Sequence, residues 1–408
     1  MDEARRAVEA IDRSSWARIL AALARRFGDL DLAEDALQGA FVQALRTWPV
    51  TGVPRSPEAW LTTTARNQAL DVVRREGVLD KKLAQLGVPE EGTTTSGGIL
   101  PDDRLELLFA CAHPVMRPED RVALTLRFVA GLTTVEVAHA LLVPVPTMQQ
   151  RLTRAKHRCR TLGVPFRIPD KEELPQRLNT VLRVIYLLYA EGFTRSTGAA
   201  HISDDLTAEA IHLARVLHTL LPADAEVTGL LGLILLTETR RPARSDPDGR
   251  PVPLADQDRS RWNRAHMAEG IALAEAAAAS QGAGSYAIQS AIAAVHAEAA
   301  TFEVTDWAQV AELYRMLDAV DPGPVIRLGR AVALGRAEGP AAGLAHLDRL
   351  ADDPALGRFR PFHIARAVTL EELGDNHGAV LAYRRALDLP GNQAEDEFLA
   401  TTLAGLAS

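Results

Sequence analysis

The 408-residue sequence predicts an all-α fold. Aromatic residues make up only 5% of the chain, while alanine, leucine and arginine are abundant, a composition that favours helix over sheet. Apolar residues recur at helical spacing between breaks rich in proline and glycine, without long stretches of strand-like alternation. The length suggests two or three domains.

Composition also restricts the class of protein. The two cysteines, Cys111 and Cys159, are too few for a disulfide scaffold and suggest a reducing compartment. The N-terminal residues lack the apolar segment of a secretory signal. The most apolar run, Leu230 to Leu236, is too short to span a membrane. We therefore expect a cytoplasmic protein without a membrane partner.

Charge is distributed unevenly along the chain. Residues 1–163 carry 22 basic and 20 acidic residues, whereas the remainder carries 23 basic and 33 acidic residues. The segment 147–163 holds five basic residues and no acidic one. Such a cluster in an acidic protein indicates a polyanion site, although a solvated helix face is the commoner origin of a charge run.

The first 76 residues contain two clear amphipathic helices. The segment 33–48 has acidic residues in its first turn, as a helix N-terminus favours. The segment 57–75 follows it. Its inward positions are predicted to be Leu61, Ala65, Ala69 and Val72, and its outward positions Thr63, Asn67 and Arg74. The stretch 87–98, GVPEEGTTTSGG, has almost nothing to bury and predicts a flexible linker.

A second helical block, from about residue 101 to 162, has the pattern of a helix-turn-helix. One helix begins at Pro118 and ends at Gly131. Thr133 and Glu136 have capping-box spacing, so a short second helix starts there. Pro144 ends the second helix, because proline lacks the amide that a helical hydrogen bond needs.

The third helix of this block is basic on one side. Pro146 suits its first position, and Val145 would then be a poor N-cap that leaves the first amides free for a phosphate. The predicted buried stripe is Met148, Leu152, Ala155 and Cys159. The opposite face carries Gln150, Arg154 and His157, flanked by Thr147, Arg151 and Arg158. Glutamine can read adenine edges and arginine can read guanine or phosphate, so this helix suits the DNA major groove.

The last third of the chain repeats itself. Arg330 to Leu334 (RAVAL) aligns with Arg366 to Leu370 (RAVTL), 36 residues later. Paired helices at this period resemble tetratricopeptide repeats, which stack into a solenoid with a concave binding face. The array would then have a protein or small-molecule partner. An ordinary series of helical hairpins without a ligand remains an equal alternative.

Several chemical sites are not favoured by the sequence. Cys111 with His113, and His157 with Cys159, are two residues apart and point in different directions on a helix, so we expect no metal site and buried cysteines instead. The acidic residues between Asp246 and Asp258 lack the terminal glutamate of an EF-hand. No phosphate loop or nucleophile motif appears. We expect no cofactor and no enzymatic activity.

Taken together, these segments resemble bacterial sigma factors of the extracytoplasmic-function type. The helices 33–48 and 57–75 are similar to the second, promoter-binding region of that family. LTTVEVAHA (132–140) and TMQQRLTRAK (147–156) are similar to its fourth region, in the same order and spacing. YAEGF (189–193) and LADQDRSRW (254–262), followed by repeats, resemble a subgroup with a long C-terminal extension.

The resemblance implies a division of the chain into five parts. Sigma region 2 would occupy 1–76, a linker 77–100, sigma region 4 101–163, a helical regulatory domain 164–275, and tetratricopeptide-like repeats 276–408. In this family the helix of region 2 binds core RNA polymerase. That role maps to Asp35, Gln38, Phe41, Val42 and Leu45. An equal alternative for the apolar positions is that Phe41, Leu45 and Trp48 are core residues.

The resemblance also implies two promoter-binding surfaces. For the −10 element the expected contacts are Arg66, Asn67, Asp71, Arg74 and Arg75, the arginines on phosphates and the other two on a base or sugar. Trp60 either stacks on a base or, more often at such a position, is structural. For the −35 element the expected contacts are Thr147, Gln149, Gln150, Arg151 and Arg154, with Lys156 and Arg158 on the DNA backbone.

The function implied is that of a sigma factor that binds core RNA polymerase and promoter DNA, with the extension as a built-in regulator. The alternative is a helix-turn-helix regulator with a repeat scaffold that does not engage polymerase. For the regulator, we expect residues 166–408 to pack against the promoter-binding modules. The expected contact zone is Glu191, Gly192, Gln257, Asp258, Arg259 and Trp262.

Overall fold

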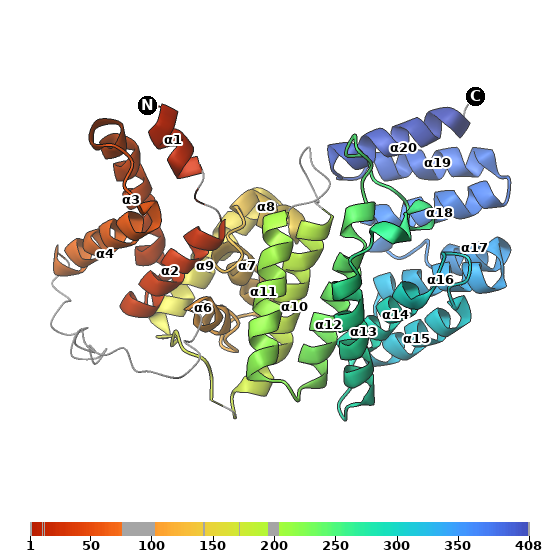
Figure 1. The fold of residues 1–408 in the computed structure, drawn as a ribbon, viewed down its shortest axis with the longest axis horizontal. Helices are drawn as coiled ribbons and strands as arrows, with labels where there is room; N and C mark the ends of the chain where they lie inside the picture. Colours follow the sequence, from red (N-terminus) through yellow and green to blue (C-terminus); the bar gives the residue numbers. More distant parts are fainter. Residues whose placement is uncertain are drawn as a thin grey trace. The chain divides into compact units, whose positions relative to one another are not determined.

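The protein is helical in its computed structural model, which describes residues 2–9, 11, 13–75, 103–141, 143–170, 172–194 and 204–406 (Figure 1). Within these ranges the regular elements are α-helices and short 3-10 helices, with one isolated bridge between Ser245 and Pro251. The expected linker 77–100 lies outside the described residues. The chain divides into two compact units, 1–184 and 185–408.

The first unit begins with four helices that form the expected region 2. They are α1 (Asp2–Glu9), α2 (Arg13–Phe27), α3 (Leu30–Thr51) and α4 (Pro57–Arg75). Helix α3 starts three residues earlier than expected because the Asp29 carboxylate caps it, accepting from the amides of Asp31 and Leu32. Helix α4 has the predicted bounds.

One inward position of α4 was predicted wrongly. Leu61, Ala65 and Ala69 are buried as expected, but Val72 is exposed and Val73 is buried in its place. The buried row continues at steps of four residues, which drift slowly around a helix of 3.6 residues per turn, so it reaches position 73.

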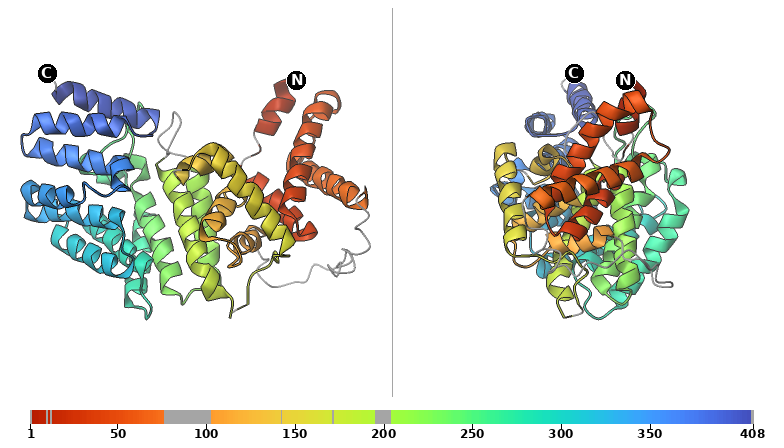
Figure 2. Two further views of the ribbon diagram at one scale, coloured as in Figure 1. Left: turned by 180° about the vertical axis from the view of Figure 1, so that it is seen from behind. Right: turned by 90° about the vertical axis from the view of Figure 1, so that its left-hand side faces the viewer.

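The second part of this unit contains the expected helix-turn-helix. Its helices are α6 (Asp103–Cys111), α7 (Pro118–Phe128), α8 (Thr134–Ala140) and α9 (Val145–Thr161). Gly131 has a φ of 65°, and the amide of Leu132 donates to the carbonyl of Leu126, which closes the end of α7. Figure 2 shows these helices, in orange and yellow, from two further sides.

The division between the two units falls within α10 (Leu174–Phe193), later than the expected boundary at 163/164. The first half of α10 packs on region 4. The buried Arg177 guanidinium donates to the carbonyl of Phe109, and Arg121 donates to the hydroxyl of Thr180, each at 3.5 Å. The start of α10 therefore belongs to the first unit.

The second unit is built around α12 (Ala225–Thr239), an apolar helix buried on nearly all sides. It packs against α11 (Asp204–Leu220), α13 (Arg264–Ala279) and α14 (Ser285–Glu298). The segment from residue 241 to 253, expected to be a loop, contains one 3-10 turn (Arg241–Ala243) and otherwise irregular structure.

The remaining helices pack on one another in chain order (Figure 2). They are α15 (Trp307–Val320), α16 (Pro324–Glu338), α17 (Pro340–Arg349), α18 (Arg360–Glu372), α19 (Asn376–Leu387) and α20 (Gln393–Leu406). The two copies of the 36-residue repeat fall on equivalent places, since Arg330 lies in α16 and Arg366 in α18. Their assignment as tetratricopeptide repeats stays a prediction.

Candidate nucleic-acid interface

Helix α4 presents the polar face that was expected to contact the −10 element. Asn67, Asp71, Arg74 and Arg75 are exposed, and Arg66 is half-buried. Arg74 and Asp71 form an ion pair at 4.0 Å on this face. The structure thus places Asn67, Asp71, Arg74 and Arg75 along one exposed side of the helix, whereas Arg66 lies beside the buried row and has an enclosed Nε.

Helix α4 is fixed by close packing against α2 and α3. Gly39 of α3 lies against Gln68, whose side-chain oxygen would be 2.1 Å from a Cβ added at that glycine. Gln68 donates to Gln43 of α3 at 2.9 Å. Glu58 at the start of α4 accepts from Ser15 of α2 at 2.7 Å. These contacts hold the polar face of α4 in one orientation.

The two tryptophans of region 2 pack on each other. Trp48 is buried, and its ring meets the half-buried ring of Trp60 edge to face at 5.4 Å. This packing favours a structural role for Trp60. Trp48 is a core residue, in agreement with the core alternative for the apolar positions of this helix.

Helix α3 carries an exposed strip that includes apolar side chains. Asp35 and Gln38 are exposed, Phe41 is half-buried, and Val42 and Leu45 are 48% and 46% exposed. Because Leu45 is nearly half exposed, it is not a core residue of the described structure. An exposed apolar strip of this kind indicates a docking surface.

Asp35, although exposed, has a raised pKa. Partial burial is the largest cause, neighbouring carboxylates add to the rise, and Lys156 acts in the opposite direction.

Helix α9, predicted to be the recognition helix, follows the short helix α8 and has its own buried stripe. Thr133 and Glu136 form the predicted capping box, with the Glu136 amide donating to the threonine hydroxyl at 3.2 Å and the carboxylate accepting from the Thr133 amide at 2.8 Å. The buried stripe of α9 is the predicted one, Met148, Leu152, Ala155 and Cys159. Both cysteines are buried and free, as expected.

The start of α9 differs by one residue from the prediction. Pro144, with extended backbone angles, is the N-cap, and the helix begins at Val145 rather than at Pro146. No side chain caps the helix, so its first amides keep the capacity to bind a phosphate.

The exposed face of α9 carries most of the side chains predicted to contact the −35 element. Thr147, Gln149, Gln150, Arg154 and Arg158 are exposed, and Arg151 is half-buried. A depression of about 440 Å³ lies between the second half of α9 and the start of α7. Its lining contains three arginines, Arg117, Arg154 and Arg158, with His157 and one acidic residue, Asp120, so the balance of charge favours an anion.

Lys156 lies on the side of α9 that faces α3, away from Arg154 and Arg158. Its side chain is only 17% exposed, and its ammonium contacts the carboxylates of Asp31 and Glu34 in α3, at 2.7 and 2.9 Å. Burial acts to lower the pKa of Lys156, but the two carboxylates outweigh it and the pKa is raised. The DNA-backbone role of Lys156 stays a prediction, and it requires the ammonium to leave these two carboxylates.

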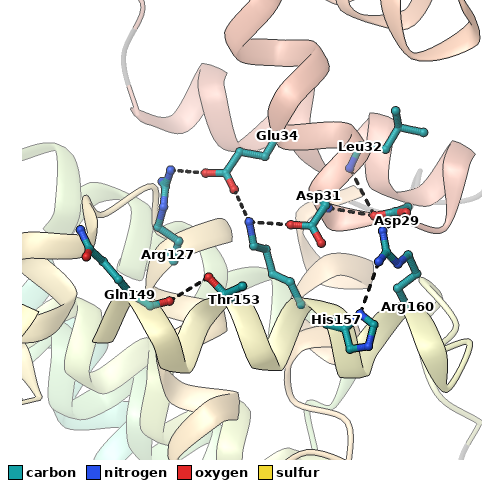
Figure 3. Close-up of polar contacts among 10 residues, drawn as sticks. Asp29, Asp31, Leu32, Glu34, Arg127, Gln149, Thr153, His157 and Arg160 are labelled. Carbon is teal, nitrogen blue, oxygen red and sulfur yellow. Dashed lines mark hydrogen bonds and ion pairs between the residues drawn. The ribbon is translucent and has the colours of Figure 1, made fainter. Parts of the chain in front are cut away.

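Two further cations join this contact between α3 and region 4 (Figure 3). Arg127 of α7 donates to Glu34, and Arg160 of α9 lies 3.7 Å from Asp29. The acidic first turn of α3 is predictable from the sequence only as a helix-dipole feature, and the local pattern predicts no role for Arg127 or Arg160. The available signal was the pairing of that turn with the acid-free segment 147–163.

The residues expected to contact the promoter-binding modules have partners inside the second unit. A Cβ on Gly192 would lie 2.7 Å from the amide of Thr207, and Gln257 donates to the carbonyl of Val252 at 3.0 Å. Arg259 donates to the carbonyls of His296 and Ala299.

The other three members of this set are likewise placed by the extension's own structure. Glu191 is buried, and Asp258 caps a 3-10 turn by accepting from the amide of Ser260. Trp262 is 5% exposed, lies under the Arg259 guanidinium at 4.5 Å, and has an indole nitrogen without a hydrogen-bond partner among the described residues. The expected contact with regions 2 and 4 stays a prediction for all six.

Comparison with known proteins agrees with this organisation. Residues 14–78 match the family model of sigma-70 region 2, and residues 106–159 match that of sigma-70 region 4. Residues 177–278 match a family described only as of unknown function. The match to this last family begins near the start of α10 and ends near the end of α13.

Two relatives extend the comparison. An uncharacterized protein, R00370, of Rhizobium meliloti (strain 1021) is 40% identical over 402 residues, covering 97% of this chain and 95% of the relative. The ECF RNA polymerase sigma factor SigW of Bacillus subtilis (strain 168) is 27% identical over 145 residues, 33% of this chain and 78% of that protein.

Fold and matches together define a sigma factor, a protein class that directs transcription initiation. The chain belongs to the sigma-70 family, in its extracytoplasmic-function group, and carries a long helical C-terminal part after region 4. Within the described ranges, no helix combines the length and apolar content that a bilayer span requires.

Proposed function

We propose that this sigma factor binds core RNA polymerase through α3 and promoter DNA through α4 and α9. The exposed strip of α3 carries the proposal, because it separates a polymerase-binding factor from a simple helix-turn-helix regulator. Val42 and Leu45 are nearly half exposed beside Asp35 and Gln38, on a helix that already buries its other face. A regulator that binds only DNA has no need of this second surface.

The −10 element would be bound by the polar face of α4. Arg66, Arg74 and Arg75 would neutralise phosphates of an opened strand, and Asn67 and Asp71 would contact a base or sugar. The −35 element would be read by α9, through the side chains of Thr147, Gln149, Gln150, Arg151 and Arg154. Arg158 would hold the DNA backbone, and Lys156 would do so once it leaves the carboxylates of α3.

The helical extension would act as a built-in regulator of these modules. Its excess of acidic over basic residues favours attraction to the basic recognition helix. The extension would inhibit transcription if it holds the modules away from DNA, and it would activate transcription if it positions them for polymerase. Experiment decides between the two. Its helical repeats would bind a protein or small-molecule partner.

Run-off transcription with purified core polymerase tests the proposal. The wild-type chain should support specific initiation, and Val42→Ser/Leu45→Ser should lose core binding by about tenfold or more, since each change removes an apolar contact of about 1–2 kcal/mol. Val320→Ser, an exposed apolar residue of α15, is the matched control and should retain full activity. Absence of specific initiation by the full chain and by the chain without its extension would contradict the proposal.

A further inference from the structure

The first turn of α3 forms a compact acidic surface. Asp29 is the N-cap, and its carboxylate is fixed by the amides of Asp31 and Leu32 at 2.9 and 3.2 Å. Asp31 and Glu34 follow on the side that faces region 4 (Figure 3). Three carboxylates on one rigid helical turn present to a cation the same chemistry as adjacent phosphates.

Region 4 meets this surface with three cations from two helices. Lys156 bridges Asp31 and Glu34, Arg160 approaches Asp29, and Arg127 of α7 donates to Glu34. The Arg127 guanidinium is held in place by the ring of Trp16 in α2, 4.9 Å from its centroid. Because side chains from α2, α3, α7 and α9 take part, the contact joins the two promoter-binding modules.

The part of the contact formed by Lys156, Arg127 and Glu34 is largely withdrawn from solvent, while the side chains of Asp31 and Arg160 are 32% and 48% exposed. The side chains of Lys156, Arg127 and Glu34 are 17%, 17% and 11% exposed, so water and salt screen these pairs less than they screen surface ion pairs. The raised pKa of Lys156 agrees with a fully charged ammonium in this position.

We propose that the acidic first turn of α3 is an intramolecular competitor of promoter DNA, which binds Lys156 and Arg160 of the recognition helix in place of DNA phosphates. The inference rests on the proposed function of α9. In the closed arrangement, in which region 4 contacts the first turn of α3, the cations are neutralised by Asp29, Asp31 and Glu34. When DNA binds, phosphates replace these carboxylates.

The same turn links DNA binding to polymerase binding. Asp35 directly follows Glu34 in α3 and belongs to the surface proposed for polymerase. A polymerase that engages Asp35 and Gln38 approaches the turn that holds α9, so core binding would favour release of the recognition helix. Such coupling is reciprocal, and DNA bound to α9 would favour polymerase binding to α3.

The test measures binding of the full-length chain to a duplex containing the −35 element. Asp31→Asn/Glu34→Gln should bind this duplex roughly tenfold more tightly than the wild type, within the usual range of coupling between sites. Glu119→Gln/Glu172→Gln removes two exposed carboxylates of the same unit and is the matched control for net charge. The control should change affinity by less than about twofold, because exposed charges are strongly screened.

Salt dependence separates competition from a merely structural role. In the wild type, DNA phosphates must displace Asp31 and Glu34 from their cations, and the displaced carboxylates then take up counterions. This uptake offsets part of the counterion release from DNA, so the salt dependence of binding is weaker. The logarithm of the association constant should therefore fall more steeply with salt in Asp31→Asn/Glu34→Gln than in the wild type, because the wild type alone has a competing ion pair that salt also weakens. An unchanged slope together with unchanged affinity would overturn the proposal.

Energy transfer between two labels detects opening without DNA or transcription. Ala59→Cys in α4 and Thr161→Cys in α9 provide exposed labelling sites, while Cys111 and Cys159 are buried. The labels should move apart in Asp31→Asn/Glu34→Gln, and Asp31→Asn alone, which keeps the Glu34 pairs, should show a smaller change.

The two readouts distinguish failure of the competition from failure of the proposed function. If the labels move apart but the chain binds no promoter DNA, the proposed function is contradicted. The ion-pair contact between α3 and region 4 is then still supported. Labels that stay at the wild-type separation, in a chain that binds DNA as the control does, would refute the competition.

Discussion

At the scale of single residues, Arg154 offers the most direct test of α9 as the recognition helix. It is exposed, and its Nε donates to the Gln150 carbonyl at 3.3 Å, so its removal leaves the helix and its buried stripe intact. If Arg154 contacts a phosphate, Arg154→Ala should weaken binding to all sequences and reduce the salt slope by about 0.9. If it reads a base, the loss should be about 1–3 kcal/mol and confined to the cognate site.

Titrations against cognate and scrambled duplexes at several salt concentrations distinguish these two cases. Binding that is unchanged for every duplex would show that α9 does not contact DNA through this face.

His296 in α14 makes the extension sensitive to acid. Burial, followed by the nearby charges of Arg240 and Arg259, lowers the pKa of His296 to about 4. Between its unfolded pKa of about 6.5 and this value the unfolded chain binds the extra proton, so stability falls as pH falls. The free energy of unfolding of the extension should drop by about 2 kcal/mol between pH 7 and pH 5 from this group.

Denaturant unfolding at both pH values, in the wild type and in His296→Gln, isolates this contribution. The variant should lose less stability on acidification than the wild type. An equal loss in both proteins would rule out His296 as the cause.

Residues whose roles depend on local spacing could be predicted from the sequence. The stripe of α9 and the Thr133–Glu136 box follow from helical periodicity and capping, which act over a few positions. The local pattern predicts a DNA contact for Lys156, because spacing over a few positions does not reveal acidic partners that are distant along the chain. Glu34 lies 122 residues earlier, and only the tertiary structure brings the two together.

At the scale of elements, the packing of α12 against α14 depends on Gly229. A Cβ at this position would lie 2.6 Å from the amide nitrogen of Ala287 and 2.8 Å from its Cα. These are backbone atoms, so the helices must separate to admit a methyl group. Gly229→Ala should destabilise the extension by about 1–3 kcal/mol, the usual cost of overpacking.

Gly405 provides the matched control, because it lies in α20 and a Cβ there meets nothing within 4 Å. Gly405→Ala should be neutral or stabilising by up to about 1 kcal/mol, since alanine favours helix. Thermal unfolding of both variants compares the two effects. A gain in stability for Gly229→Ala would contradict the close packing of α12 and α14.

The helices themselves were largely predictable, while their ends and pairings were not. Helix α4 has the expected bounds because Pro57 starts it and its apolar row is regular. The early start of α3 and the N-cap at Pro144 depend on backbone angles that the sequence signals only weakly. The pairing of α3 with α9 depends on contacts that are distant along the chain.

At the scale of the whole molecule, the first unit provides a better truncation point than the end of region 4. Cutting after Gly163 removes Arg177 and Thr180, which hydrogen-bond to region 4. Cutting after Val184 keeps them. A tethered domain acts near millimolar effective concentration, so even a contact of about 0.1 mM affinity would be about 90% occupied in the full chain.

Residues 1–184 should therefore differ from the full chain by up to about tenfold in run-off transcription, in a direction that reveals the sign of regulation. Hydrogen exchange of residues 13–75 and 103–170 should rise when the extension is absent. Equal transcription and equal exchange would identify the extension as an independent partner-binding module.

The order of the two units along the chain has a consequence for protein synthesis. At about 5–20 residues per second, residues 185–408 emerge over about 10–45 s after the first unit is complete. During this interval the promoter-binding modules are folded but have no regulator. The ion pairs of Asp29, Asp31 and Glu34 with region 4 lie entirely within the first unit, so the nascent sigma factor can close before its extension has been translated.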